Sequence, residues 1–243
     1  MKRSAAFPAM LFALLLAPLP LFAAEPACLD CHPDKKEGKT VHPAIEMGCS
    51  SCHAGNHQGE KPFPKLTTAV PDLCFTCHDK AAFEKRSVHT PVAGGMCTSC
   101  HNPHSSKNAK LLTALPPDLC FTCHDKSMFT KKTVHPPVKD GQCTYCHSPH
   151  ASDHSSVLTQ PLADLCATCH DQQTSGRHVM AAFSASDAHP VKGKPDPSRS
   201  GRELSCTSCH NPHASEQKKL FTNEGKSPGN LCLLCHKKIM VRQ

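Results

Sequence analysis

The sequence predicts a mostly irregular chain in which short α-helices form a repeat array, with little or no β-structure. The chain has 243 residues but no Trp, a single Tyr, 22 Pro and 18 Cys, so its side chains could barely fill a conventional core. A unit of two cysteines and a histidine also recurs along the chain, at a period typical of stacked repeats rather than of one core. Something other than side chains must therefore fill the interior.

The N-terminal segment predicts an export signal. Lys2 and Arg3 precede an apolar stretch over residues 9–21, and two small residues follow at Ala23 and Ala24. This order is typical of a secretory signal peptide, and the stretch is shorter than the ~20 residues that cross a bilayer. We therefore expect residues 1–24 to be removed. Residues 25–243 would then form a periplasmic or exported domain without a transmembrane segment, with outer-membrane association or an extracellular location as further alternatives.

Every cysteine belongs to a Cys-x-x-Cys-His unit. Residues i, i+3 and i+4 share a face of one helical turn, so two thiols can bond one porphyrin while the histidine reaches its iron. Disulfides and four-thiolate zinc sites are the alternatives, but neither explains a histidine after every second cysteine. The spacing predicts nine covalently attached haem c groups, with attachment cysteines Cys28, Cys31, Cys49, Cys52, Cys74, Cys77, Cys97, Cys100, Cys120, Cys123, Cys143, Cys146, Cys166, Cys169, Cys206, Cys209, Cys232 and Cys235. The proximal iron ligands would be His32, His53, His78, His101, His124, His147, His170, His210 and His236.

The units alternate between two kinds. First-kind units begin, at a constant step of 46 residues, at Cys28, Cys74, Cys120 and Cys166. Second-kind units begin at Cys49, Cys97, Cys143 and Cys206, and Cys232 begins a final half repeat. Short helices are expected to run through the motifs, with N-caps at Asp72, Asp118 and Asp164 and with stops imposed by Pro103, Pro149 and Pro212. About four and a half repeats result, over roughly 25–70, 71–116, 117–162, 163–225 and 226–243.

Further histidines are candidates for the sixth iron position. Four recur between the two kinds of unit, at His42, His89, His135 and His189, and four follow second-kind units, at His57, His104, His150 and His213. These eight leave the ninth iron without a periodic partner, so His178 is a candidate for it. His154, in a polar segment, fits a surface residue better. Methionine is the rival ligand, but too few methionines follow the signal segment to serve nine irons. The pattern predicts mostly bis-histidine, low-spin haems.

The stretch CTSCHNPHSSKNAKLLTALPPDLCFTCH at 97–124 resembles the unit of the doubled CxxCH motif proteins, multihaem c-type cytochromes of the cytochrome c3-like superfamily. The resemblance covers nearly all of 25–243. It departs at CHAGNH, where His57 follows His53 by four residues without a proline. It implies bis-histidine ligation and a chain of nine haems that passes electrons in anaerobic or extracellular respiration. The implied partners are other c-type cytochromes, a quinol-oxidising membrane complex or an outer-membrane conduit.

Charge and cofactor content favour an electron carrier, without catalytic residues, over other classes. The formal net charge is +7, but the haem propionates would outweigh it, so nucleic acid is not an expected partner. A reductase would need an open sixth position, for which the ninth haem, at Cys232–His236, is the candidate, although the chain is small for a catalytic pocket. A conducting subunit of a porin–cytochrome complex or of a filament is a further alternative. The insert over 171–205 is expected to be an exposed loop, with a docking surface or a helix that carries His178 as the alternatives.

Overall fold

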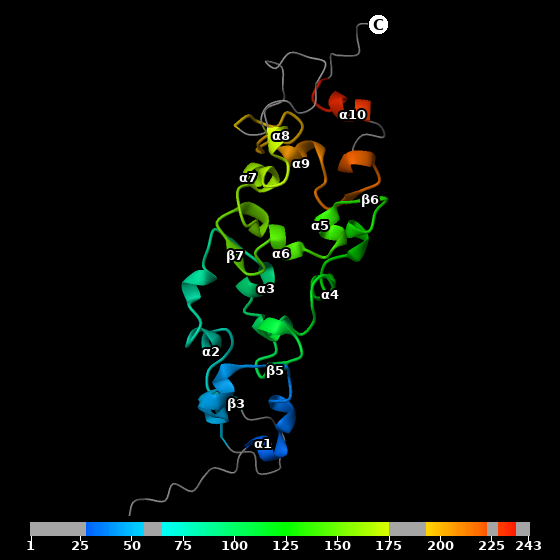
Figure 1. Ribbon diagram of the computed structural model, residues 1–243. Coiled ribbons are helices and arrows are strands. Elements are labelled where there is room, and N and C mark those ends of the chain that lie inside the picture. Colours follow the sequence, from blue (N-terminus) through cyan, green and yellow to red (C-terminus); the bar gives the residue numbers. More distant parts are fainter. Residues whose placement is uncertain (1–27, 56–64, 175–192, 223–227, 237–243) are drawn as a thin grey trace, which may run out of the picture.

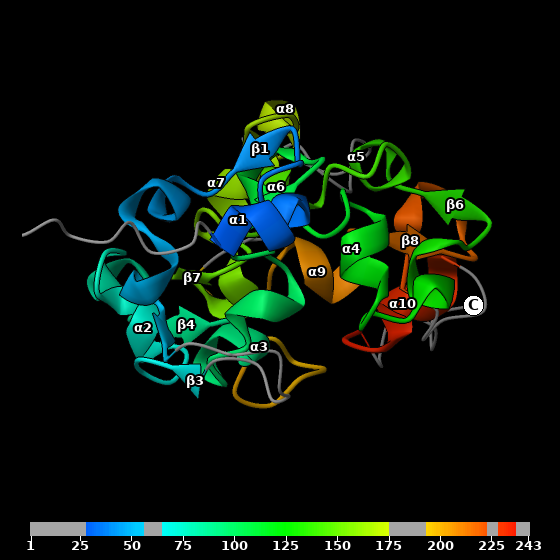
Figure 2. The same ribbon diagram turned by 90° about the horizontal axis from the view of Figure 1, so that it is seen from below.

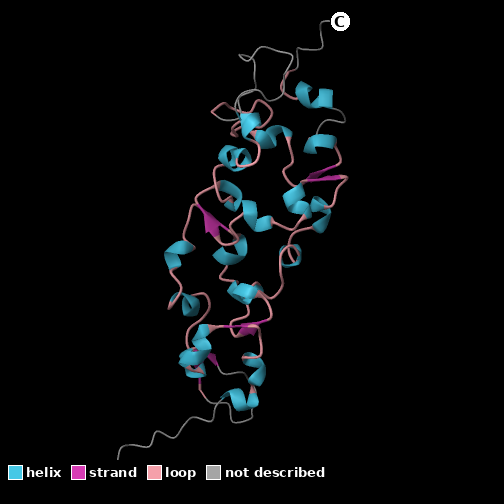
Figure 3. Cartoon of the chain, viewed as in Figure 1, coloured by secondary structure: helices cyan, strands magenta, loops and turns pink. Residues whose placement is uncertain are grey.

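Short helices joined by irregular segments make up most of the chain. The computed structural model describes residues 28–55, 65–174, 193–222 and 228–236 (Figure 1). The α-helices are α1 (Cys28–Cys31), α2 (Asp72–Phe75), α3 (Thr90–Ala93), α4 (Asp118–Phe121), α5 (Pro136–Lys139), α6 (Cys143–Cys146), α7 (Leu162–Ala167), α8 (Asp171–Thr174), α9 (Cys206–Cys209) and α10 (Pro228–Leu233). Tighter 3-10 turns are η1 (Pro33–Lys35), η2 (Pro43–Met47), η3 (Cys49–Ser51), η4 (Lys80–Ala82), η5 (Cys97–Ser99), η6 (Ala109–Leu111), η7 (Lys126–Phe129), η8 (Ser155–Val157) and η10 (Lys218–Leu220). The predicted loop-rich fold class is confirmed (Figure 3).

The array is elongated, and the chain climbs it from one end to the other (Figure 1). The helices of first-kind units alternate between two sides of the long axis: α1, α4 and α10 lie on one side, and α2 and α7 lie on the other. The view from below shows α2 and α4 well separated across the molecule (Figure 2). Consecutive repeats therefore face each other across the axis. Of the helices that the structure describes, none has the length and apolar character needed to cross a membrane.

Two-residue strands tie neighbouring repeats together. Three antiparallel ladders join residues distant in sequence: β1 (Thr40–Val41) pairs with β5 (Ser105–Ser106), β4 (Ser87–Val88) with β7 (Ala151–Ser152), and β6 (Thr133–Val134) with β8 (Ala214–Ser215). The fourth ladder is local and joins β2 (His53–Ala54) to β3 (Lys65–Leu66). Each of the three long-range ladders links one repeat to the next, so they set the order of the array.

The protein interior holds few apolar side chains. Among the described residues, the buried hydrophobic side chains are Ala151, Leu158 and Ala214, and two of these lie in the ladders. Side chains alone therefore do not close the fold, as the composition predicts.

The predicted N-caps at Asp72, Asp118 and Asp164 are wrong. The capping positions are held by prolines, Pro71 for α2, Pro117 for α4 and Pro161 for α7. Asp72 and Asp118 are the first helical residues, and Asp164 is the third residue of α7. The aspartates still lie in the first turn, where a negative charge interacts favourably with the helix dipole. Sequence reasoning thus placed helices at these motifs but began them too late, by one residue for α2 and α4 and by three for α7, and it chose the wrong capping residues.

A glycine at the end of α3 permits close contact with the start of α2. Gly95 has a φ of 68°, and a Cβ placed on it would lie 2.8 Å from Cδ of Pro71. Replacing Gly95 with alanine is therefore expected to lower the unfolding free energy by about 2–4 kcal/mol, through backbone strain and overpacking. Denaturant unfolding of the haem-loaded protein measures this. Gly94→Ala is the matched control: its nearest such contact is 3.5 Å from the oxygen of Thr90, so a loss as large as that of Gly95→Ala would contradict the explanation.

Candidate haem-binding sites

Each Cys-x-x-Cys-His motif folds into one tight helical turn. In eight of the nine motifs, the backbone N–H of the histidine donates to the carbonyl oxygen of the first cysteine at 2.8–3.1 Å, for His32, His78, His101, His124, His147, His170, His210 and His236. This i to i−4 bond places both thiols and the imidazole on one side of the turn. All eighteen cysteines are free thiols, so no disulfide competes for them. Their Sγ atoms are those that become the thioether sulfurs of haem c.

The histidines that follow first-kind units are held between a ladder and a proline-started helix. His42, His89 and His135 each precede such a helix, with extended backbone angles of φ −63° to −68° and ψ 126° to 132°. Proline in the first helical turn fixes its own φ and needs no hydrogen bond there, so the helix begins just after the histidine. The recurrent VHP-type sequence therefore fixes the backbone from which each imidazole projects.

The histidines that follow second-kind units are held by the turn before them. The backbone N–H of His104 donates a hydrogen bond to Oδ1 of Asn102 at 2.9 Å. The backbone N–H of His213 donates in the same way to Oδ1 of Asn211 at 3.0 Å. An asparagine that bonds the backbone two residues on forms a turn. The chain consequently reverses between the proximal histidine and the next histidine, and the two rings of such a motif lie in different places.

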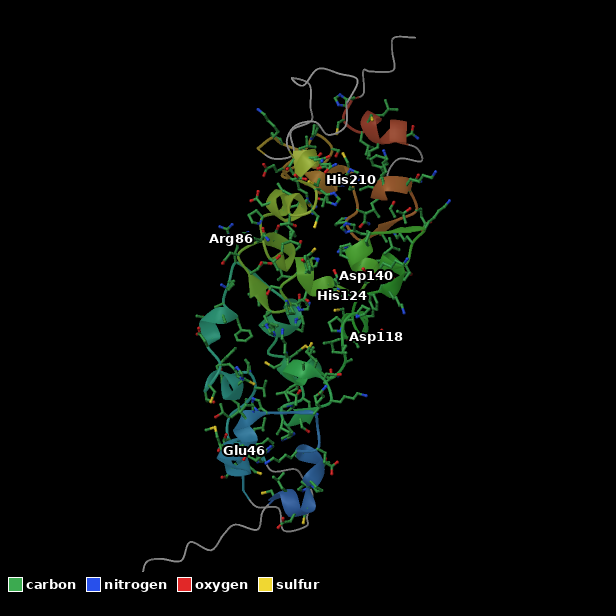
Figure 4. The ribbon with its side chains drawn as sticks, in the orientation of Figure 1. Glu46, Arg86, Asp118, His124, Asp140 and His210 are labelled. Carbon is green, nitrogen blue, oxygen red and sulfur yellow. The ribbon has the colours of Figure 1, made fainter. Side chains whose placement is uncertain are left out.

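Six pairs of imidazole rings form between motif histidines and periodic histidines. Their ring centroids lie 5.9–6.2 Å apart with interplanar angles of 7–29°, for His42 with His78, His104 with His53, His89 with His124, His150 with His101, His135 with His170, and His213 with His147. Two metal–nitrogen bonds of about 2 Å, with about 1 Å from each nitrogen to its ring centre, span roughly 6 Å. The spacing therefore fits one iron between each pair. Figure 4 shows His124 midway along the array and His210 toward its C-terminal end.

The pairs follow one register. A histidine of the first set, such as His89, meets the motif histidine of the next first-kind unit, here His124. A histidine of the second set, such as His150, reaches back one repeat to the preceding second-kind unit, here His101. The two histidines of one motif, such as His101 and His104, therefore belong to different pairs. Each of the six described pairs is built from two repeats.

The ladders join the ligand candidates of neighbouring sites. The backbone N–H of His42 donates to the carbonyl of His104, that of His89 to His150, and that of His135 to His213, at 2.8–2.9 Å. The Nδ1 atom of His89 also lies 2.9 Å from the carbonyl oxygen of Pro149. A ring whose Nδ1–H donates to a carbonyl keeps the lone pair of Nε2 free for a metal. The ladder thus fixes both the place and the tautomer of His89.

Burial favours the neutral form of five distal imidazoles. It lowers the pKa of each of them, and the charge of the paired motif histidine lowers each further: His42, His104, His135, His150 and His213. Only the neutral ring can bind a metal. In two sites an aromatic ring adds to the enclosure, because Phe83 lies 5.1 Å from the ring of His150 and Phe129 lies 5.0 Å from that of His213. Sequence reasoning missed these phenylalanines, although both stand five residues after a first-kind histidine.

The attachment cysteines of successive motifs lie close together. Burial and a shared hydrogen bond with Cys97 raise the pKa of the Cys74 thiol, and Cys143 acts in the same way on Cys120, whose pKa rises to about 11. Cys166 shares a hydrogen bond with Cys206. Burial raises the pKa values of Cys100, Cys146 and Cys209, and the nearby Cys123, Cys169 and Cys235, respectively, raise them further. Cys52 of the second motif also acts on Cys74. Neighbouring attachment points therefore follow one another from the second motif to the ninth.

The remaining candidate iron ligands belong to none of the six described pairs. His57, His178 and His189 lie outside the described residues, and most of the insert over 171–205 does too. Within its described part, Asp196 is buried and accepts hydrogen bonds from Ser198 and Ser208. His154 takes a turn position, where its backbone N–H donates to Oγ of Ser152, as that of Asn108 does to Ser106. The side chain of His154 is half-buried, and its ligand or surface role stays a prediction.

The donor set distinguishes haem from a bare metal ion. In the described part of the chain, no three or more His, Cys, Asp or Glu side chains converge as a metal site requires. A structural zinc site takes four such ligands, and a catalytic zinc site takes three. Two opposed imidazoles beside a pair of cysteines suit a metal that brings its own four equatorial nitrogens. Attachment motifs and imidazole pairs, repeated along an extended array, define a multihaem c-type cytochrome.

Comparison with known proteins agrees with this class. The chain belongs to the family described as the doubled CXXCH motif, whose model matches residues 42–83, 89–129, 135–175 and 197–241. These four blocks hold eight of the nine motifs, so at least eight haems are covalently attached. The chain is also 35% identical over 85 residues to the multiheme cytochrome MtrA of Shewanella baltica (strain OS185), a match that covers 32% of this chain and 25% of that protein. The matched segment thus spans about a quarter of this relative's length.

Proposed function

We propose that the protein is an electron conduit of nine haems, each held between two histidines, without substrate chemistry. The six imidazole pairs at 5.9–6.2 Å carry this proposal. The haem iron, when bound, supplies the reversible one-electron change. When haem is bound, the cysteines would attach the porphyrins, and the paired imidazoles would hold the irons and keep substrates from them.

The register of the described pairs extends to the ends of the array. By the first-set rule, His189 is assigned to the motif of His236. His57 has no preceding second-kind unit, and the motif of His32 has no preceding repeat, so these two are assigned to each other. His178 is then left for the motif of His210. The ninth site would thus have a periodic ligand, and the eighth would take the histidine outside the pattern. With these assignments all nine sites are filled.

Order along the conduit follows from the attachment points. Because the thiols of successive motifs approach each other from the second to the ninth, electrons would pass between sites in sequence order. The alternation of α2, α4 and α7 across the long axis agrees with a path that crosses between the two sides (Figure 1). Electrons would then move along the long axis of the array, so the electron donor and the electron acceptor would dock at its opposite ends.

Export and partners belong to the same proposal. The signal pattern over residues 1–24 supports a periplasmic or exported protein, and the resemblance to doubled CxxCH proteins supports a role in anaerobic respiration. Other c-type cytochromes, a quinol-oxidising membrane complex or an outer-membrane conduit are the proposed partners. Reductase activity is the alternative, and it needs an open iron site that the assignment above does not leave.

The spectrum of the oxidised protein tests the proposal. Bis-histidine ligation at all nine sites is expected to give only low-spin ferric signals in electron paramagnetic resonance, and the reduced protein is expected not to bind carbon monoxide. The intact mass should show nine haems. A high-spin signal from one site, or carbon monoxide binding at one site, would favour the reductase instead. Molecules that lack one or more haems are excluded by measuring only protein whose intact mass corresponds to nine attached haems.

A further inference from the structure

Three turns adopt a backbone conformation that their residues disfavour. The pairs Lys110–Leu111, Ser156–Val157 and Lys219–Leu220 have φ between 48° and 58°, and all six residues are non-glycine. Left-handed backbone is unfavourable for an L-residue, and it is a clear outlier for a β-branched side chain such as Val157. No other non-glycine residue in the described part of the chain has a positive φ. Strained backbone that recurs at equivalent positions is commonly tied to function.

The first residue of each turn bonds the proximal histidine of a second-kind motif. The Nδ1 atom of His101 lies 2.8 Å from the carbonyl oxygen of Lys110, that of His147 lies 3.0 Å from Ser156, and that of His210 lies 2.8 Å from Lys219. Since a carbonyl can only accept, Nδ1 carries the proton and donates it. Nε2 is then left with its lone pair, as an iron ligand requires.

The second residue of each turn bonds the backbone beside the same histidine. The N–H of Asn102 donates to the carbonyl of Leu111 at 2.8 Å, that of Ser148 to Val157 at 2.7 Å, and that of Asn211 to Leu220 at 2.7 Å. Two successive left-handed residues thus direct two carbonyl oxygens at one motif, one toward the ring and the other toward the main chain. A right-handed turn would direct them elsewhere. These bonds offset the strain and explain why the conformation persists without glycine.

We propose that the three left-handed turns are positioning elements that fix the orientation and the donor strength of the proximal imidazoles of second-kind motifs. This inference rests on the iron ligation proposed above. It identifies the turns as the elements that tune the proximal imidazoles as iron ligands. A carbonyl that accepts from Nδ1–H makes the imidazole a more basic ligand and favours the ferric state. Each turn therefore lowers the reduction potential of its own haem.

First-kind motifs obtain the corresponding bond from a different partner. For the pair of His124 and His89, the bond runs from Nδ1 of the distal His89 to the carbonyl of Pro149, in the ladder region. The structure thus anchors the proximal ring at second-kind sites through a strained turn, and the distal ring at this first-kind site through a ladder. Changing a turn should affect one second-kind haem and leave first-kind haems unaltered.

Ser156 allows a clean test, because its side chain is exposed and the change acts on the backbone. In the haem-loaded protein, Ser156→Pro forbids a positive φ, since the ring fixes φ near −65°. The potential of one haem, that of the His147 site, is expected to shift upward in a spectroscopic redox titration, with a changed low-spin g-value. Ser156→Gly is the matched control: it keeps the left-handed turn, and it should leave potential and g-values unchanged while raising the melting temperature.

Two results would overturn the inference. One is a Ser156→Pro protein with a lower melting temperature and an unaltered potential; the other is a Ser156→Gly protein whose potential shifts as far as that of Ser156→Pro. If Ser156→Pro does not fold, Ser156→Val supplies the comparison. A β-branched residue disfavours the left-handed turn less severely than proline, so the reduction potential should shift upward by a smaller amount. An unchanged potential in folded Ser156→Val protein would count against the inference. The wild-type spectrum separates this failure from failure of the proposed function, since a high-spin His147 site in the unaltered protein would contradict ligation itself.

Discussion

Replacing His150 with alanine is expected to convert one haem from low spin to high spin, and that haem is the one attached at Cys97 and Cys100. The ring of His150 lies 5.9 Å from that of His101 and belongs to no pair with His147, the proximal histidine three residues before it. Loss of the imidazole therefore opens the sixth position one repeat back along the chain. The measurements are electron paramagnetic resonance of the oxidised protein and carbon monoxide binding by the reduced protein, where one site should respond.

A second background identifies the site that responds. In a protein that lacks the haem at Cys97 and Cys100 because both cysteines are alanines, adding His150→Ala should create no new high-spin signal. A signal in that background would assign His150 to another motif and would contradict the register. His154→Ala is the matched control, since His154 stands four residues away in a turn position and should leave all sites low spin.

The sequence allowed the fold class and the helical turn at the Cys-x-x-Cys-His motifs to be predicted, because both depend on local composition and spacing. A Cys-x-x-Cys-His unit fixes the turn through one backbone bond, such as that from His101 to Cys97, whatever surrounds it. The low apolar content likewise predicted the sparse interior. The periodic histidines could be recognised as a set for the same reason, since each keeps its place within a repeat.

The pairing of those histidines could not be predicted, because it depends on contacts between repeats. The ladder between Val88 and Ala151 brings His89 beside His150, yet neither short strand has a sequence signature. Two-residue strands bury too few side chains to leave an alternating pattern. The left-handed turn at Ser156 is equally hidden, because the residues there are not glycine or asparagine. The wrong N-cap at Asp118 has the opposite origin: its local signal was strong, but the preceding Pro117 occupies the capping position.

Removing the attachment cysteines of a central motif is expected to have the second large effect. The double replacement Cys120→Ala and Cys123→Ala should yield a chain lighter by one haem, with the rings of His89 and His124 left without their metal. Because haem binding contributes to the folding free energy of such a site, the melting temperature should fall. The intact mass measures the first effect, and thermal unfolding followed by the absorbance of the remaining haems measures the second.

The same replacement tests the order of the conduit. Cys120 shares a hydrogen bond with Cys143 on one side and lies near Cys100 on the other, so this motif bridges its two neighbours in sequence. Removing it should sharply reduce the conductance of single molecules held between two electrodes by their ends. Cys28→Ala with Cys31→Ala is the matched control, because it removes one haem at the end of the array and leaves the internal order intact. Equal conductance losses for the central and the terminal replacement would contradict a path in sequence order. Such a result would indicate a branched path or one that bypasses the central haem, because loss of that haem would then have no larger effect than loss of a terminal haem.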